Sequence, residues 1–431
     1  MKQENVLLDV AVIGAGHAGL SVSYYLKKYE LNHIIFERER IGESWRSQRW
    51  DSFTMNTPNK NNILPGQEYS GSKPQEFCTA KEFVTALEEY ALQFQLPVKE
   101  YSKVISVEKN SSEQTFTISV SENSTIKNYI SKQIVISSGS QNEKKIPSFA
   151  GNISSDILQL HTAEYRGTSQ LLPGAVLVTG SAQSGCQIAE DLAEAGRRVY
   201  LATSIVPRIP RRYRGKDIVD WFMEMNFFNV KTETITDPKI FAIKVPQISG
   251  IGQFGHTLSL QSLAKKGVTI LGKMENANAS DVFFIPNAHE HIKFADGFSQ
   301  TAKSMVDEFI LKNGINADEP EVDPADMPDP DASCASNITR LNLKEQNINS
   351  IIWSTGFHGD FSYVKLPVFD HDGNPKHKNG ISAINGLYFL GLPWLRMRKS
   401  AMIFGINDDA LFIADEVLKN CNVTLNEDLR N

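Results

Sequence analysis

The sequence has few cysteines, and none of them is spaced as a pair. Four are present among 431 residues, at Cys78, Cys186, Cys334 and Cys421. No CxxC or CxxxxC spacing joins any two of them, which argues against a disulfide framework, a zinc ribbon and a redox-active disulfide. Histidines, aspartates and glutamates also form no cluster with metal-ligand spacing, so no metal is expected.

Long apolar runs and a strong net charge are absent as well. No apolar segment approaches the roughly 18 residues that predict a transmembrane helix, and the net charge of −6 speaks against nucleic acid as the main partner. The first strand-like run begins almost at the initiator methionine, which leaves no room for a signal peptide. We therefore expect a cytoplasmic protein, with neither a membrane nor a nucleic acid as partner.

A glycine motif follows the first apolar run of the chain. The strand-like run 7–13 leads into Gly14-Ala15-Gly16-His17-Ala18-Gly19, and a helix-like stretch follows. Gly14 permits the tight turn, Gly16 lets the backbone approach a pyrophosphate, and Gly19 allows the helix to pack close to the strand. The next strand-like run ends at Glu37, where a ribose-binding carboxylate belongs, and Arg38 follows it. This order predicts a dinucleotide site.

A second motif of the same kind appears in the middle of the chain. Strand-like residues 175–179 lead into Gly180-Ser181-Ala182-Gln183-Ser184-Gly185, with alanine where the middle glycine is usual. The following strand ends at Thr203 with no acid, and four arginines come shortly after it: Arg208, Arg211, Arg212 and Arg214. A missing carboxylate and nearby arginines favour the 2′-phosphate of NADPH over NADH. The alternative is that these arginines form a solvated basic loop.

Two such motifs predict an α/β fold with two Rossmann-like dinucleotide-binding domains. The sequence of residues 134–139 closely resembles that of residues 351–356, and each of the two segments falls where the chain passes between the two units. We expect residues 1–165 to form the first part of one domain, 166–350 the second domain, and 351–431 the completion of the first, which is therefore discontinuous. The acidic, proline-rich stretch 317–332 is expected to be an exposed loop or a lid.

Several segments together resemble the flavin-containing monooxygenases, and more closely their bacterial and plant relatives. The resemblance covers most of the chain and rests on both glycine motifs and Glu37, and on four further segments: 42–51, 161–166, 354–357 and 386–391. One departure is that Ser155 and Ile157 stand where the family's fingerprint has phenylalanine and glycine. The region 216–345 has no clear counterpart in the animal enzymes, and we expect substrate recognition to have diverged there.

The resemblance implies a cofactor pair, a reaction and a set of residues. The first site would hold FAD and the second NADPH, with NADH less expected. Reduced FAD would react with dioxygen to give a C4a-(hydro)peroxyflavin, which passes one oxygen to a small substrate with a nucleophilic nitrogen or sulfur. Asn56 matches the family's active-site asparagine, and Trp45, Arg46, Gly356 and Gly391 would contact a cofactor. A homodimer is possible.

Two other functions stay open from the sequence. The altered fingerprint at Ser155 and Ile157 leaves room for a Baeyer–Villiger oxygenase or an uncoupled NADPH oxidase. Ala182 in the second motif leaves room for a flavin-binding sensor without catalytic activity. Asn56 could equally be a turn residue, because the run 56–59 is rich in turn formers.

Overall fold

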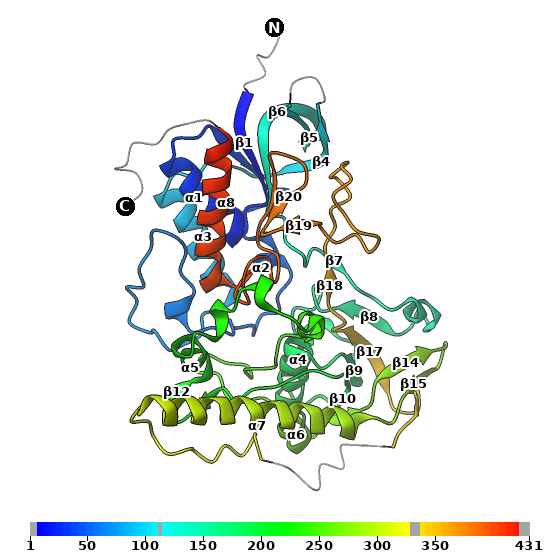
Figure 1. Cartoon of the computed structure of the whole chain (residues 1–431). Helices are drawn as coiled ribbons and strands as arrows, with labels where there is room; N and C mark the ends of the chain where they lie inside the picture. Colours follow the sequence, from blue (N-terminus) through cyan, green and yellow to red (C-terminus); the bar gives the residue numbers. More distant parts are fainter. Residues whose placement is uncertain (1–6, 111–113, 328–336, 422–431) are drawn as a thin grey trace.

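Two mainly parallel sheets, each with its own helices, make up the molecule. The computed structural model describes residues 7–110, 114–327 and 337–421, so Cys334 and the end of the acidic stretch, 328–332, lie outside the described residues. The first unit contains the N-terminal third and the C-terminal helix, and the second lies beside it (Figure 1). The expected α/β class with two dinucleotide-binding units, the first discontinuous, is confirmed.

The two units repeat one order of five parallel strands. In the first unit the order is β3 (Val98–Lys99), β2 (His33–Phe36), β1 (Leu7–Ile13), β6 (Thr125–Ile136) and β21 (Leu387–Phe389). In the second it is β13 (Thr269–Leu271), β10 (Val199–Ala202), β9 (Ala175–Thr179), β17 (Ile348–Trp353) and β8 (Leu158–His161). Strands β1 and β9 are central and almost wholly buried, as their continuous apolar sequences require.

The fifth strand of each sheet enters from a different part of the chain. Strand β21 returns from the C-terminal segment to pair with β6, which makes the first unit discontinuous. Strand β8 instead comes from the linker before β9 and pairs with β17. It lies within the range 1–165 that the sequence analysis gives to the first domain, yet it pairs in the second sheet. The exact domain boundaries stay a prediction.

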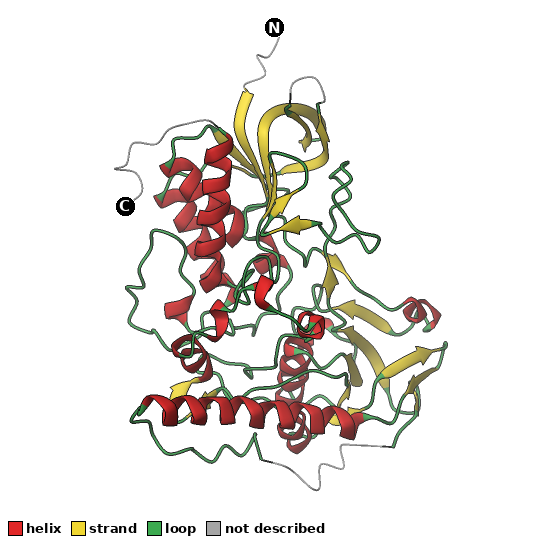
Figure 2. Ribbon diagram, in the orientation of Figure 1, coloured by secondary structure: helices red, strands yellow, loops and turns green. Residues whose placement is uncertain are grey.

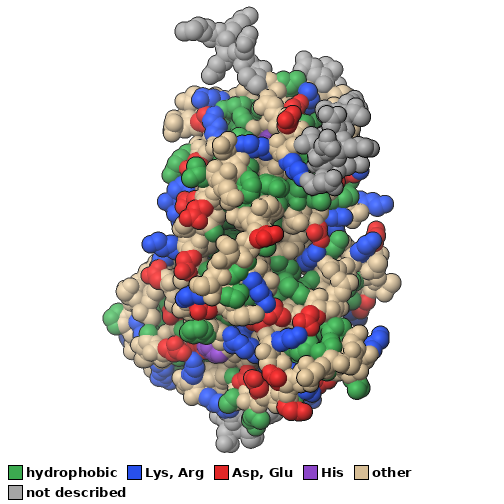
Figure 3. All heavy atoms as spheres, turned by 90° about the vertical axis from the view of Figure 1, so that its left-hand side faces the viewer, with side chains coloured by type: hydrophobic (Ala, Val, Ile, Leu, Met, Phe, Trp, Pro, Cys, Tyr) green, Lys and Arg blue, Asp and Glu red, His purple; other side chains and the backbone are tan. Residues whose placement is uncertain are grey.

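Helices cover the sheets in layers (Figures 1 and 2). Beside the first sheet lie α1 (His17–Lys28), α3 (Ala80–Gln93) and α8 (Ile406–Asn420), and the second unit carries α4 (Gln183–Glu194), α6 (Leu260–Lys265) and α7 (Ala288–Asn313). Within the described part of the chain, no helix has both the length and the apolar character needed to span a bilayer. Acidic and basic side chains are interspersed on the face seen in Figure 3.

Short elements complete the two units. They are the helices α2 (Glu43–Ser47) and α5 (Ile218–Glu224), the antiparallel strands β4 (Ser102–Lys109) and β5 (Phe116–Glu122), and the strands β7 (Glu143–Lys144), β11 (Arg212–Tyr213), β12 (Lys216–Asp217), β14 (Met274–Ala277), β15 (Asp281–Phe284), β16 (Arg340–Asn342), β18 (Phe357–His358), β19 (His377–Lys378) and β20 (Ile381–Ser382).

The insertion 216–345 reaches back to the first unit through a backbone ribbon. Residues 228–232 run antiparallel to 396–399, with a bridge between Lys231 and Met397. The amide of Thr232 donates to the carbonyl of Arg396 at 2.8 Å, and the amide of Arg398 donates to the carbonyl of Val230 at 2.9 Å. The insertion therefore packs against the loop that follows β21.

The last glycine of each motif lets a helix lie directly on the preceding strand turn. A Cβ on Gly19 would overlap the carbonyl oxygen of Gly14, and a Cβ on Gly185 would overlap that of Gly180 in the same way. Neither position has a positive φ, so the requirement is for space rather than for backbone freedom. Both α1 and α4 depend on this close packing.

Replacing Gly185 by alanine is expected to lower the free energy of unfolding by about 1–3 kcal/mol, because the methyl group must push α4 off β9. Urea unfolding followed by circular dichroism measures the change. Gly297→Ala in α7 is the matched control, because its Cβ meets no atom within 4 Å; there alanine should stabilise by about 0.5–1 kcal/mol. Equal effects of the two substitutions would contradict the packing argument.

Candidate functional site

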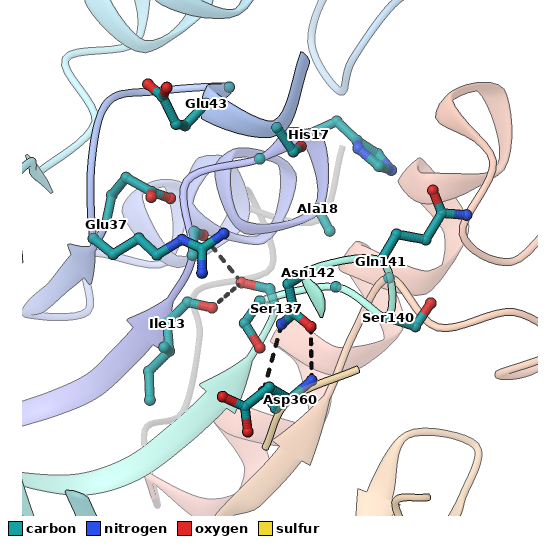
Figure 4. Close-up of a pocket in the computed structure, with 18 of the residues that line it drawn as sticks. Ile13, His17, Ala18, Glu37, Glu43, Ser137, Ser140, Gln141, Asn142 and Asp360 are labelled. Atoms are coloured by element: carbon teal, nitrogen blue, oxygen red, sulfur yellow. Dashed lines mark hydrogen bonds between the residues drawn. The ribbon is translucent and has the colours of Figure 1, made fainter. Parts of the chain in front are cut away.

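A cavity of about 360 Å³ opens at the first glycine motif. Its walls come from the β1–α1 turn, the ends of β2 and β6, the segment 42–49 that contains α2, and residues between β21 and α8. Figure 4 shows Glu37 and Ile13 on one side of this cavity and His17 and Gln141 on the other. Such a cavity at the carboxyl ends of parallel strands is where this class of fold binds nucleotides.

The turn from β1 to α1 exposes backbone to the cavity. Gly14 has a φ of +105°, and a Cβ there would come within 2.7 Å of the carbonyl oxygen of Ser137. At Gly16 a Cβ would meet no protein atom within 4 Å, although the residue lines the cavity. No side chain caps the N-terminus of α1. Its free N–H groups and its dipole therefore form an anion site that a pyrophosphate fits.

Glu37 is buried at the end of β2 and fixed by the backbone. Its carboxylate accepts hydrogen bonds from the amides of Ala15, at 2.7 Å, and Glu39, at 3.1 Å. Burial raises the pKa of this carboxyl, and the backbone hydrogen bonds oppose the change. Arg38 and Lys103 line the cavity beside it. This arrangement suits a ribose, whose hydroxyl groups donate to a carboxylate.

His17 lies in the cavity wall as a neutral imidazole. Burial lowers its pKa from 6.5 to about 4, and the backbone of Ala401 opposes the change only partly. Its Nε2 is buried and has no hydrogen-bond partner among the described residues. His17 and Ala18, which the first glycine motif predicts to contact a cofactor, both line the cavity. A polar group of a ligand could satisfy the free nitrogen.

Some residues of α2 line the cavity, and others do not. Trp45 lines the cavity, whereas Arg46 pairs with Glu88 at 2.5 Å and approaches Glu43 at 3.9 Å. Arg46 is not among the residues that line the cavity, and a contact between Arg46 and the cofactor stays a prediction. Gly391 lines the cavity with a φ of +77°, and a Cβ there would press on the Cβ of Ala18 at 2.8 Å.

Several lining residues were not identified from the sequence. Ser137, directly after β6, donates from its hydroxyl to the carbonyl of Ile13 at 2.9 Å. The side-chain amide of Asn142 accepts from the backbone N–H of Asp360 at 2.6 Å and donates to the carbonyl of Asp360 at 3.4 Å (Figure 4). Asn142 and Asp360 are 218 residues apart, so no local pattern could have joined them. The similarity between the sequences of 134–139 and 351–356 was the only sequence feature that pointed to Ser137.

The second glycine motif repeats the geometry of the first. The amide of Gly14 donates to the carbonyl of Phe36 at 2.8 Å, and Gly180 donates to Ala202 at the same distance. Ser137 and Ser354 likewise close the two turns from the ends of β6 and β17. No side chain caps α4, whose N-cap is Ala182. The second motif therefore offers the same free N–H groups, including those of Gln183, Ser184 and Gly185.

Thr203 occupies in the second unit the place that Glu37 has in the first. It follows Ala202 as Glu37 follows Phe36, and its hydroxyl donates to the carbonyl of Leu271 at 2.6 Å. A neutral residue here removes the repulsion that a carboxylate would exert on a 2′-phosphate. Gly356, with a φ of +86°, lies beyond Ser354, where a Cβ would meet no atom within 4 Å.

Arg208 and Arg211 are not available to a phosphate, which corrects their expected role. Arg208 is 1% exposed and pairs with Asp326 and with Asp296 at 2.7 Å. Arg211 is also 1% exposed and pairs with Asp217. Buried charges need such partners. The same contact shows that the acidic stretch is not simply solvated, because the Asp326 side chain is 4% exposed.

Lysines gather where the arginines were expected. The Nζ of Lys244 donates to the hydroxyl of Ser204 at 3.2 Å, directly after Thr203. Burial lowers the pKa of Lys244, and the nearby charges of Lys145 and Lys273 lower it further. These three side chains come from separate segments of the chain, so their meeting was not visible in the sequence. They supply positive charge at the end of β10.

Asn56 lies where the two units meet. Its side-chain oxygen accepts from Nε2 of Gln187, in the first turns of α4, at 3.4 Å. Its carbonyl accepts from Arg211 at 3.0 Å. The segment that begins in the first cavity at Trp45 thus reaches the second nucleotide unit at Asn56. A role in catalysis stays a prediction, but the position is more than that of a surface turn.

Comparison with known proteins places this geometry in a family. Residues 11–248 match the family model described as pyridine nucleotide-disulphide oxidoreductase. An uncharacterized oxidoreductase CzcO-like of Geobacillus kaustophilus is 31% identical over 96% of this chain and 99% of its own. A probable indole-3-pyruvate monooxygenase, YUCCA9 of Arabidopsis thaliana, is 22% identical over 72% of this chain and 75% of its own.

A solved structure shares the whole fold. The flavin-containing monooxygenase from Stenotrophomonas maltophilia aligns with a TM-score of 0.65 and 17% identity, covering 96% of this chain and 99% of its own.

The free energy of unfolding is expected to fall as the pH is lowered from 6.5 towards 4, because His17 takes up its proton in the unfolded chain before it does so in the folded one. His17→Gln should reduce this loss by about 2 kcal/mol. Urea unfolding at several pH values measures it. His371→Gln is the control, since that side chain is 89% exposed; an equal effect of both variants would contradict the assignment.

Proposed function

The chain belongs to the pyridine nucleotide-disulphide oxidoreductase family, as an FAD-dependent oxidoreductase of the flavin-containing monooxygenase type, and we propose that it uses NADPH and dioxygen to oxygenate a small substrate with a nucleophilic nitrogen or sulfur. The observation that carries the proposal is the contact of Asn56 with Gln187, because it joins the segment that follows Trp45 and Arg49 in the wall of the first cavity to the nucleotide helix of the second unit. A reaction that passes electrons between two dinucleotides needs such a junction.

The first cavity fits FAD. The open space over Gly16 would receive the pyrophosphate at the N-terminus of α1, and Glu37 would receive the adenosine ribose. FAD supplies the chemistry of accepting hydride and activating oxygen, and the protein supplies binding, orientation and shielding. In this proposal the neutral imidazole of His17 and the ring of Trp45 border the far part of the bound cofactor and keep water from it.

The second motif fits NADPH. Its pyrophosphate would lie on the free N–H groups of Gln183 to Gly185, and its 2′-phosphate would lie at Ser204 beside Lys244. Asn56 would then stand between the nicotinamide and the flavin, where its side-chain amide can hold a polar group of either. Arg211 keeps the backbone of Asn56 in place through its hydrogen bond to the carbonyl.

Purified protein is expected to carry FAD and to oxidise NADPH with equal uptake of dioxygen when an amine, thiol or sulfide substrate is present. Absorbance at the flavin and nicotinamide bands, an oxygen electrode and mass spectrometry of the product measure this. Gly16→Val should fold, because its Cβ meets no protein atom, but should lose FAD because the side chain fills the cradle.

Other results would redirect or end the proposal. An ester formed from a ketone indicates a Baeyer–Villiger oxygenase, and hydrogen peroxide without product indicates an NADPH oxidase. Flavin that NADPH cannot reduce indicates a sensor. A purified protein that binds no FAD ends the proposal.

Lys244→Met is expected to raise the KM for NADPH about tenfold and to leave that for NADH unchanged, because only NADPH brings the 2′-phosphate to Ser204. Steady-state kinetics with both nucleotides measures the split. Lys239→Met, in the same exposed segment, is the control. If Lys244→Met weakens NADPH and NADH equally, the lysine does not select the phosphate.

A further inference from the structure

Arg49 is a cation in the wall of the first cavity, and no described carboxylate pairs with it. Its guanidinium lies over the ring of Trp45, at 4.6 Å from the ring centre, and near that of Phe53, at 5.4 Å. Within the part of the chain that the structure describes, its guanidinium makes one hydrogen bond, from Nη1 to the carbonyl of Gln48 at 2.9 Å. Among the described residues no ion pair joins Arg49 to Asp51, although the sequence allows one.

Arg49 is partly buried, and two arginines that are more deeply buried both pair with carboxylates of the protein. Arg208 pairs with Asp296 and Asp326, and Arg211 pairs with Asp217. Burial alone lowers the pKa of Arg49 to about 10, so the group stays charged at neutral pH without a counter-charge. Partial burial of a charge without a counter-charge costs free energy, and an anionic group of a ligand would lower that cost.

The position of Arg49 indicates which part of a ligand supplies that charge. Arg38 and Lys103 line the cavity near Glu37, at the ribose end. Arg49 lies towards the second unit, because its carbonyl accepts from Arg166 at 3.4 Å and the segment continues from it to Asn56 and Gln187. His17, which also lines the cavity, is neutral, and the carboxylate of Glu43 pairs with Arg40 at 3.0 Å. The unmatched charge is therefore at the end where hydride would arrive.

We propose that Arg49 faces the N1–C2=O edge of the isoalloxazine and stabilises the negative charge that this edge gains on reduction. The inference rests on the proposed binding of FAD in the first cavity. In the step concerned, NADPH gives a hydride, which is two electrons and one proton, to flavin N5. NADP⁺ leaves, and the neutral ring becomes an anion whose charge lies at N1 and O2. Arg49 then has the partner that the protein does not provide.

The test compares the midpoint potential of bound FAD in wild type, Arg49→Met and Arg49→Lys. The potential is measured at equilibrium against a reference dye while an enzyme, and not dithionite, reduces the flavin slowly. Arg49→Met is expected to lower the affinity for reduced FAD relative to oxidised FAD at least tenfold, which is a shift of about 30 mV to more negative potential for two electrons. Arg49→Lys should recover part of the shift. Arg212→Met, which removes the same charge from an exposed site, should cause none.

Affinity of the apoprotein for oxidised FAD separates the possible anions. If Arg49→Met weakens oxidised and reduced FAD by the same factor, the arginine binds the permanently charged pyrophosphate, and the proposal is overturned. An unchanged potential and unchanged affinity overturn it too.

A measurement on wild type needs no variant and covers the case that Arg49→Met does not fold. The potential should change with pH as for one proton per two electrons around neutral pH, because the reduced ring stays anionic. Uptake of two protons would overturn the proposal. If wild type binds no FAD at all, the proposed function fails; if FAD binds and only the potentials disagree, this inference alone fails.

Discussion

The contact between a helix N-terminus and the strand turn before it is the interaction on which both nucleotide sites depend. Gly19 and Gly185 have no side chain at the point where α1 and α4 lie on the carbonyls of Gly14 and Gly180. Because the helices sit this close, their uncapped N–H groups are held at the carboxyl end of the sheet. An anion there gains hydrogen bonds and a favourable dipole without any charged side chain.

The basic side chains near the two nucleotide sites are of two kinds. Some pair with carboxylates and stabilise the fold, and others have no such partner and can bind a ligand. Arg208 and Arg211 are enclosed with aspartates and fasten the acidic stretch and the insertion to the second unit. Lys244 and Arg49 have no such carboxylate among the described residues, and each lies at a nucleotide site. A buried ion pair has already met its desolvation cost and offers little to a phosphate, whereas an unmatched cation offers much.

The sequence predicted what depends on local order and missed what depends on distant contacts. Gly14, Gly16 and Glu37 follow from one strand, turn, helix and strand, so their arrangement was readable. The similarity between the sequences of 134–139 and 351–356 also predicted that the first unit is discontinuous. Arg208 looked like a phosphate ligand because its partner Asp326 is 118 residues away. Lys244 was missed for the same reason, since Ser204 lies 40 residues before it.

The insertion contacts the wall of the first cavity through residues that belong to neither glycine motif. The ribbon of 228–232 with 396–399 ties the insertion to the loop between Pro393 and Ala401, and both of those residues line the first cavity. Backbone hydrogen bonds carry this contact, so they tolerate changes of side chain. Substitutions in the insertion can therefore reshape the wall of the cavity while Gly16, Glu37 and Asn56 keep their places. That separation would let one chain architecture hold the same two nucleotides and accept different small substrates.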